Sequence, residues 1–151
     1  CCVVTVKSMT AAGFISTGLS AFLGFFFLFA GVSKTTDLTP ASGEMQSGFR
    51  NGVWGALWGL PSVPFLKFVG VTEILTGLGL WAYVAGLAPQ VLAQWSAFVP
   101  VGITVAATTS HVLNGDPSFA ITFCGVITTL FLVNNFAMAA YFASIKATKV
   151  A

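Results

Sequence analysis

The stretch that decides the fold is Phe68-Val-Gly-Val-Thr-Glu-Ile-Leu-Thr-Gly-Leu-Gly-Leu-Trp81, an apolar run that carries a single carboxylate, Glu73. So long an apolar run is typical of a helix surrounded by lipid. An ionised carboxylate is costly in hydrocarbon and needs a basic or hydrogen-bonding partner. We therefore predict a membrane-spanning helix whose Glu73 points toward other helices of the same protein.

The composition of the whole chain supports a membrane protein. Of its 151 residues 56% are hydrophobic and 7% are charged, whereas soluble domains contain about 25% charged residues. Four apolar runs come near or exceed the roughly 20 residues that cross a bilayer: residues 11–32, 65–87, 91–112 and 118–144. We predict an all-α, integral membrane four-helix up-down bundle that forms one domain over residues 1–151. The net charge of +2, without a basic tract, excludes nucleic acid as a partner.

The chain begins with Cys1 and not with methionine, which predicts a processed protein or a fragment of a longer precursor. A removed targeting segment would fit an organellar membrane, thylakoid or mitochondrial inner. The three cysteines, Cys1, Cys2 and Cys124, lack the spacing of metal ligands. We expect no metal site, and we expect Cys124 to be a small buried hydrophobic residue.

The longest connection, residues 35–64, contains an amphipathic pattern. Hydrophobic residues recur there at every fourth position: Met45, Phe49, Val53 and Leu57. This spacing predicts a short helix that lies in the membrane interface. Thr39 and Pro40 are suited to its start, with Thr39 as N-cap.

Polar and small residues indicate which faces of the spans meet. In the first span, small residues mark one face, among them Gly24 and Gly31, and let another helix approach closely. Four phenylalanines mark the opposite face, which we expect to contact lipid or a partner protein: Phe22, Phe25, Phe26 and Phe29. In the fourth span, Asn134 and Asn135 are expected to form hydrogen bonds between helices.

Chain order predicts where the ionisable residues lie. Lys34 ends the first span and Glu73 comes early in the second, while His111 ends the third and Asp116 precedes the fourth. Because successive spans reverse direction, all four residues fall at the same end of the bundle. We predict a polar cluster there, with Lys34 and Glu73 as an ion pair, because a lone buried carboxylate is costly.

Several roles are open for this cluster. A buried ion pair can simply fix the register of helices, or the cluster can bind a ligand such as a quinone headgroup. His111 also fits a hydrogen-bonded residue of the membrane interface, and Asp116 before Pro117 fits an N-cap. The sequence shows no nucleophile and base in an arrangement that predicts catalysis.

Three short motifs resemble DoxX-like membrane proteins. They are Phe27-Leu-Phe-Ala-Gly-Val-Ser-Lys34, then Gly70-Val-Thr-Glu73 with Gly77-Leu-Gly79, and His111-x-x-x-Gly-Asp-Pro117. The last is similar to the turn between helices three and four in the nicotinic-receptor assembly chaperones, distant relatives with the same layout. The likeness extends from Phe25 to about Leu132. The resemblance implies a protein of four helices. It also implies a function as a membrane subunit associated with quinone-linked thiosulfate oxidation or as a small assembly factor. By this resemblance the residues of interest are Lys34, Glu73, His111 and Asp116.

We therefore expect a non-catalytic accessory or assembly subunit of a larger membrane complex, respiratory or photosynthetic, with the lipid bilayer and other membrane subunits as partners. The first alternative is a membrane subunit of a quinone-linked oxidoreductase. The second is a pigment- or lipid-binding subunit, in which His111, Gln94 or Asn135 would ligate a chlorophyll magnesium. Quinone, lipid and chlorophyll are accordingly the ligands under consideration.

Overall fold

The structure is a computed structural model that describes residues 10–50, 59 and 61–150. These residues form helices and connections and contain no strand. In chain order the helices are α1 (Ala11–Thr35), α2 (Ser42–Arg50), α4 (Ser62–Val84), α5 (Gln90–Asn114) and α6 (Ser118–Val150). The long helices α1, α4, α5 and α6 are each long and apolar enough to cross a membrane, so the prediction of an all-α, multi-pass membrane fold is confirmed.

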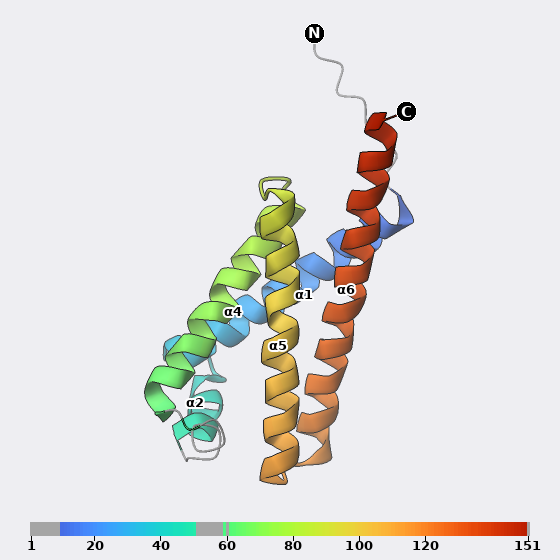
Figure 1. Ribbon diagram of the computed structural model, residues 1–151. Coiled ribbons are helices and arrows are strands. Elements are labelled where there is room, and N and C mark those ends of the chain that lie inside the picture. The colour runs from blue at the N-terminus through green and yellow to red at the C-terminus, as the bar shows by residue number, and fades with distance from the viewer. Residues whose placement is uncertain (1–9, 51–58, 60, 151) are drawn as a thin grey trace.

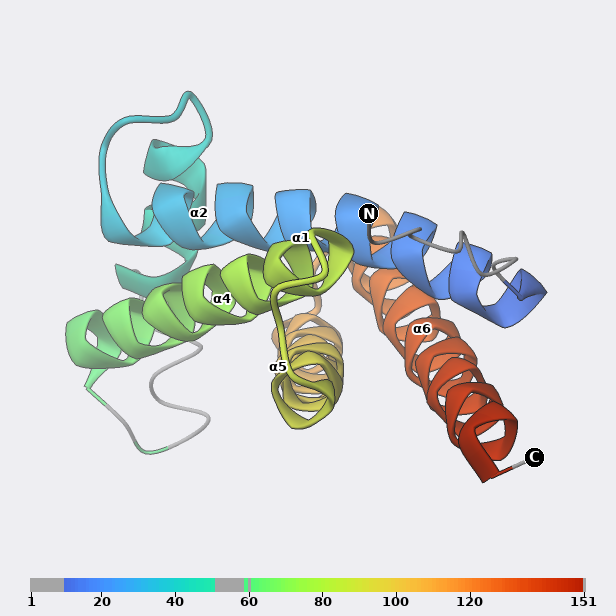
Figure 2. The ribbon, with the colours of Figure 1, turned by 90° about the horizontal axis from the view of Figure 1, so that it is seen from above.

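Successive long helices run in opposite directions (Figure 1). The start of α1 and the end of α6 lie at one end of the molecule, and α2 and the α5–α6 turn lie at the other. Helix α1 packs along α4 and also crosses α6, while α5 lies beside α6. From their hairpin, α4 and α5 diverge toward the opposite end, as the two perpendicular views agree (Figures 1 and 2). Helices α4 and α5 are therefore closest at their hairpin and farther apart toward the start of α4.

The short helix between the first two spans is present as α2, but it begins later than expected. Its first residue is Ser42, so the prediction that Thr39 caps it at Pro40 is wrong. The Thr39 hydroxyl lies 2.6 Å from the Ser33 hydroxyl and 3.0 Å from that of Ser42, and it thus joins the turn to the end of α1. Val53 and Leu57, the second half of the predicted amphipathic pattern, lie outside the described residues.

Glycines bring α1 and α4 into close contact. A Cβ atom on Gly31 would lie 2.5 Å from the carbonyl oxygen of Gly70, and one on Gly77 would lie 2.9 Å from that of Gly24. Both distances are below any ordinary contact, so the two backbones touch without intervening side chains. The small-residue face predicted for the first span is confirmed at Gly24 and Gly31, which are buried.

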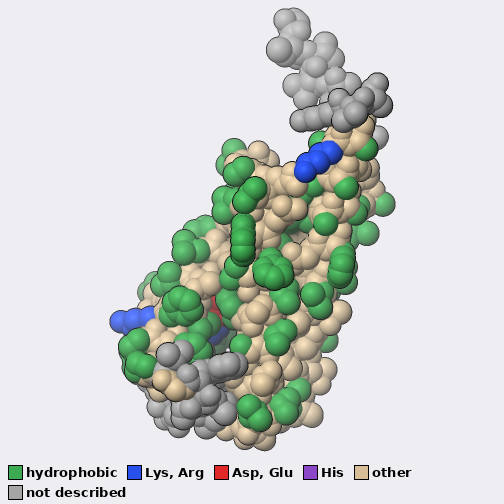
Figure 3. Space-filling view, viewed as in Figure 1, with side chains coloured by type: hydrophobic (Ala, Val, Ile, Leu, Met, Phe, Trp, Pro, Cys, Tyr) green, Lys and Arg blue, Asp and Glu red, His purple; other side chains and the backbone are tan. Residues whose placement is uncertain are grey.

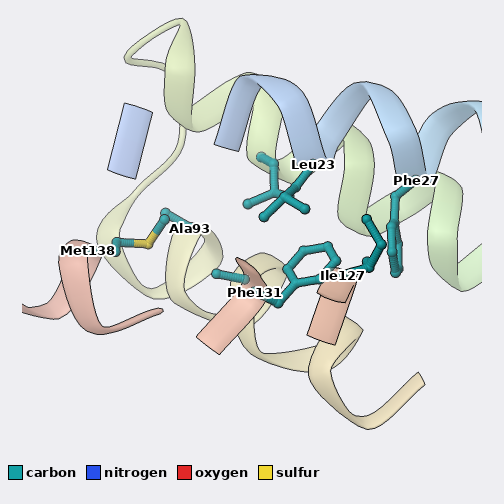
Figure 4. Packing of buried hydrophobic residues seen from close by; sticks show 8 residues of the cluster. Leu23, Phe27, Ala93, Ile127, Phe131 and Met138 are labelled. Atoms are coloured by element: carbon teal, nitrogen blue, oxygen red, sulfur yellow. The ribbon is translucent and has the colours of Figure 1, made fainter. Parts of the chain in front are cut away.

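The hydrophobic core joins all four long helices (Figure 4). Its buried members are Leu23, Phe27, Leu80, Ala93, Ala97, Ile127, Phe131 and Met138. The rings of Phe27 and Phe131 meet edge to face with centroids 4.7 Å apart, a favoured aromatic geometry. Of the four phenylalanines expected to face outward, Phe22, Phe25 and Phe29 are exposed. Phe26 differs, because it packs partly buried against Phe27 of α1 and Phe123 of α6.

Hydrogen bonds join helices at the two asparagines of α6, as predicted. The Asn134 amide donates to the Ser20 hydroxyl of α1 at 3.1 Å, and the Ser20 hydroxyl also lies 3.3 Å from Asn134 Oδ1. Asn135 Nδ2 donates to the Ala97 carbonyl of α5 at 2.7 Å. Such bonds are stabilising between membrane helices because no water competes for the same groups.

We expect Gly31→Ala to lower the free energy of unfolding by about 1–3 kcal/mol, because the added methyl group would force α1 and α4 apart. Gly18→Ala, on the same helix, is the matched control, since nothing lies within 4 Å of the added atom. Its expected effect is a gain of up to about 1 kcal/mol from helix propensity. Denaturant unfolding in detergent measures both, and equal stability of the two variants would contradict the close contact.

Candidate functional site

The predicted ion pair between Lys34 and Glu73 is present. Lys34 Nζ lies 2.8 Å from Glu73 Oε1 and 2.7 Å from Oε2, and Glu73 is only 4% exposed. Lys34 follows Gly31 by three residues and Glu73 follows Gly70 by three, so each ion shares a helix face with a contacting glycine. The glycine contact between α1 and α4 thus brings the two charges together.

His111 and Asp116 form a second pair across the turn between α5 and α6. His111 Nδ1 lies 2.6 Å from Asp116 Oδ2, and Asn114 Nδ2 donates to the other carboxylate oxygen at 2.6 Å. Gly115 has the left-handed φ of 69° that ends α5 and turns the chain back. Helix α6 begins at Ser118, and the Asp116 carboxylate bonds to these two side chains, so its predicted role as N-cap is wrong.

All four predicted residues line one cavity of about 680 Å³, within the usual range for small-molecule sites. Helices α1, α4, α5 and α6 form its walls, and α2 adds Glu44 and Met45. Within this lining Lys34 pairs with Glu73 and His111 pairs with Asp116. Figure 3 shows an acidic group within a hollow between α4 and α5 on one face of the molecule. The site is therefore a largely apolar cavity whose lining includes two polar pairs.

Sequence reasoning missed most of the lining of this cavity, including one acidic residue and one cysteine. Glu44 lines it from α2, and Cys124 lines it from α6. Cys124 was expected to be a small buried hydrophobic residue, but it is only partly buried and lines the cavity. The position of Glu44 on an amphipathic segment between the first two spans was the available signal for it. Nothing in the sequence near Cys124 indicates a cavity.

The formal charge of the lining is negative. The lining contains one lysine, Lys34, and three carboxylates, those of Glu44, Glu73 and Asp116. With the histidine counted as neutral, one positive and three negative charges leave a formal net charge of −2. Such a lining repels anions and accepts neutral or cationic groups.

The ion pair keeps some of its hydrogen-bonding capacity. An ammonium group has three N–H donors, and Lys34 directs two bonds to the Glu73 oxygens. A carboxylate has about four acceptor positions, and Glu73 uses two of them for Lys34. The pair can therefore donate one hydrogen bond and accept another without separating its charges.

The three residues considered as chlorophyll ligands do not share a site. His111 lines the cavity described above, whereas Gln94 and Asn135 line a separate groove between α5 and α6, together with Trp95, Phe98 and Phe136. Among the described residues, no three His, Cys, Asp or Glu side chains gather closely enough to hold a metal ion.

These features define a class of protein: a four-span integral membrane protein with a largely apolar cavity that contains two polar pairs. The family model of the DoxX-like family matches residues 18–134, more than half of the chain, and the protein belongs to this family. No curated protein and no solved structure matches the chain. The family match covers the motifs around Lys34, Glu73 and His111, on which the resemblance was based.

We expect Lys34→Met to lower the free energy of unfolding by roughly 3–5 kcal/mol, because it leaves the buried Glu73 carboxylate unpaired. The double variant Lys34→Met/Glu73→Gln should recover at least about half of this loss, since no buried charge remains. Lys67→Met, at an exposed lysine of α4, is the control and should change stability by no more than about 0.5 kcal/mol. If the double variant lost as much stability as Lys34→Met and Glu73→Gln lose separately when added together, this result would contradict a direct pair.

Proposed function

We propose that this DoxX-like protein is a non-catalytic accessory subunit of a larger membrane complex, and that its cavity binds the headgroup of a quinone. The observation that carries the proposal is the buried Lys34–Glu73 pair, which lines the cavity and can both donate and accept a further hydrogen bond. A quinone bound there would supply a carrier of two electrons and two protons to the complex.

The residues of the cavity fit this ligand class in both of its states. A quinone presents carbonyl acceptors, to which the third N–H of Lys34 can donate. A quinol presents hydroxyl donors, which the Glu73 carboxylate can accept. His111, held at Nδ1 by Asp116, adds a second polar group to the lining of the cavity. Because donor and acceptor lie side by side, either state is bound without a change in the ion pair.

The charge of the lining favours an uncharged headgroup over a phospholipid. A phosphate would meet the carboxylates of Glu44, Glu73 and Asp116 with one lysine to offset them. Like charges at short distance repel each other. A neutral quinone ring forms hydrogen bonds there without this repulsion.

The accessory role rests on a different surface. Phe14, Phe22, Phe25 and Phe29 are exposed on α1 and recur at helical spacing, so they form one aromatic stripe along its outer face. We propose that this stripe contacts other membrane subunits of a respiratory or photosynthetic complex in a thylakoid or mitochondrial inner membrane. Cross-linking mass spectrometry from solubilised native membranes should recover partner subunits linked near α1, and recovery of a monomer alone would contradict the proposal.

We expect the purified protein in lipid nanodiscs to bind 2,3-dimethoxy-5-methyl-benzoquinone, a quinone without a tail. In Lys34→Met/Glu73→Gln the affinity should fall at least about tenfold, because one charge-assisted hydrogen bond contributes about 1.5–3 kcal/mol. Lys67→Met should bind as the unmodified protein does. Equilibrium dialysis measures the three affinities.

An unchanged affinity for the quinone in the double variant would show that the ion pair does not bind the quinone. Stronger binding of a phosphate-bearing probe such as glycerol phosphate than of the quinone would contradict the choice of an uncharged headgroup. The pigment alternative remains a prediction of the sequence, and the optical absorption spectrum of the purified protein tests it.

A further inference from the structure

The three carboxylates that line the cavity differ in their partners. Glu73 receives two hydrogen bonds from Lys34, and Asp116 Oδ2 lies 2.6 Å from His111 Nδ1. Within the part of the chain that the structure describes, the Glu44 carboxylate forms no hydrogen bond and no ion pair. Because the other two carboxylates are already engaged, Glu44 is the one available to a positively charged ligand.

Hydrogen bonds fix the position of α2, and with it that of Glu44. Gln46 Nε2 donates to the Thr36 carbonyl at 3.0 Å and to Asp37 Oδ1 at 3.1 Å, in the connection that follows α1. Gln46 is only 7% exposed, whereas Glu44, two residues earlier, is exposed and lines the cavity. The charge of Glu44 is therefore a fixed feature of the cavity wall.

Phenylalanines of three helices also line the cavity. They are Phe26, Phe27, Phe65, Phe68, Phe119 and Phe123. Phe119 and Phe123 of α6 stack with ring centroids 6.0 Å apart, and Phe123 meets Phe26 of α1 edge to face at 5.6 Å. The face of an aromatic ring carries partial negative charge and attracts cations. The aromatic wall and the carboxylates thus favour the same sign of charge in a ligand.

Chain order places an aromatic ring and two carboxylates at one end of the molecule. Phe119 is the second residue of α6 and follows Asp116 by three positions. Helix α2, which carries Glu44, lies at the same end as the α5–α6 turn (Figure 1). Because all three residues line one cavity, a single ligand at this end can meet both kinds of group.

We propose that the cavity also binds a small organic cation of the quaternary ammonium class, with its charged group against Glu44 and the ring of Phe119. A quaternary ammonium has no N–H to donate, so negative charge and aromatic faces recognise it. The formal charge of −2 in the lining favours a free cation over a choline lipid, whose phosphate would meet the same carboxylates. This inference goes beyond the proposed quinone site, because it depends on other residues than the Lys34–Glu73 pair.

Equilibrium dialysis of the full chain in a neutral maltoside detergent tests the proposal with phenyltrimethylammonium, and with benzenesulfonate as an anion of similar size. The protein should bind the cation and not the anion. Glu44→Gln should lower the affinity for the cation at least about fivefold, the effect of one carboxylate at close range even in water. Asp37→Asn is the matched control, because it removes a charge outside the cavity lining and keeps an oxygen that can accept from Gln46. It should change the affinity no more than about twofold, since more distant charges are screened.

Phe119→Leu tests the aromatic contribution and should lower the affinity for the cation at least about twofold, because leucine has no ring face. Phe136→Leu is its matched control on α6. Phe136 is 75% exposed and Phe119 is 77% exposed, but Phe136 lines the separate groove between α5 and α6, so its replacement should not change the affinity. Equal affinities of the two variants for the cation would overturn the role of the ring.

Absence of binding of phenyltrimethylammonium, or equal binding of benzenesulfonate, would overturn the proposal. An unchanged affinity in Glu44→Gln, or an equal loss in Asp37→Asn, would overturn the assignment of the charge to Glu44. Tighter binding of phosphocholine than of phenyltrimethylammonium would overturn the choice of a free cation over a lipid headgroup. Because none of these probes is a quinone, failure of the quinone to bind would contradict the proposed function alone.

Discussion

The contact between α1 and α4 is the constraint on which the site depends. Lysine and glutamate can pair inside a membrane only if their helices approach closely enough for direct hydrogen bonds, since no water is present to bridge them. Gly31 and Gly70 allow that approach, and each lies one helical turn from its ion. The glycine contact that buries the two charged groups therefore also lets them form hydrogen bonds with each other. The Glu73 carboxylate can for this reason remain inside the bundle.

A second consequence of this packing is the shape of the remaining space. Helix α1 is held against α4 by the glycines, and it reaches α6 through the Ser20–Asn134 hydrogen bonds. Helices α4 and α5 meet near their hairpin, where Ser96 occupies the space beside Gly79. Away from that hairpin they diverge, and the space between them becomes the cavity. The Lys34–Glu73 and His111–Asp116 pairs are part of its lining.

Much of the fold could be predicted from the sequence because its signals are local. A run without charges identifies a span, and the cost of an unpaired carboxylate identifies Lys34 as the partner of Glu73 once the spans alternate. The pairing of His111 with Asp116 could not be predicted in this way, because it depends on the left-handed turn at Gly115. The cavity, and Glu44 and Cys124 within it, depend on how α4 tilts away from α5. That angle is set by many contacts together, so no single residue indicates it. The inward position of Phe26 depends on its contact with Phe123 of α6, a residue distant in sequence.

The central claim is the direct pairing of Lys34 with Glu73 within the bilayer, and solid-state NMR tests it most directly. Protein labelled with ¹⁵N at lysine Nζ and ¹³C at glutamate Cδ, reconstituted in lipid, should show strong dipolar coupling between the two nuclei, and this coupling should vanish in Lys34→Met. Strong coupling that persists in that variant, or its absence from the unmodified protein, would contradict the pairing and the site built around it.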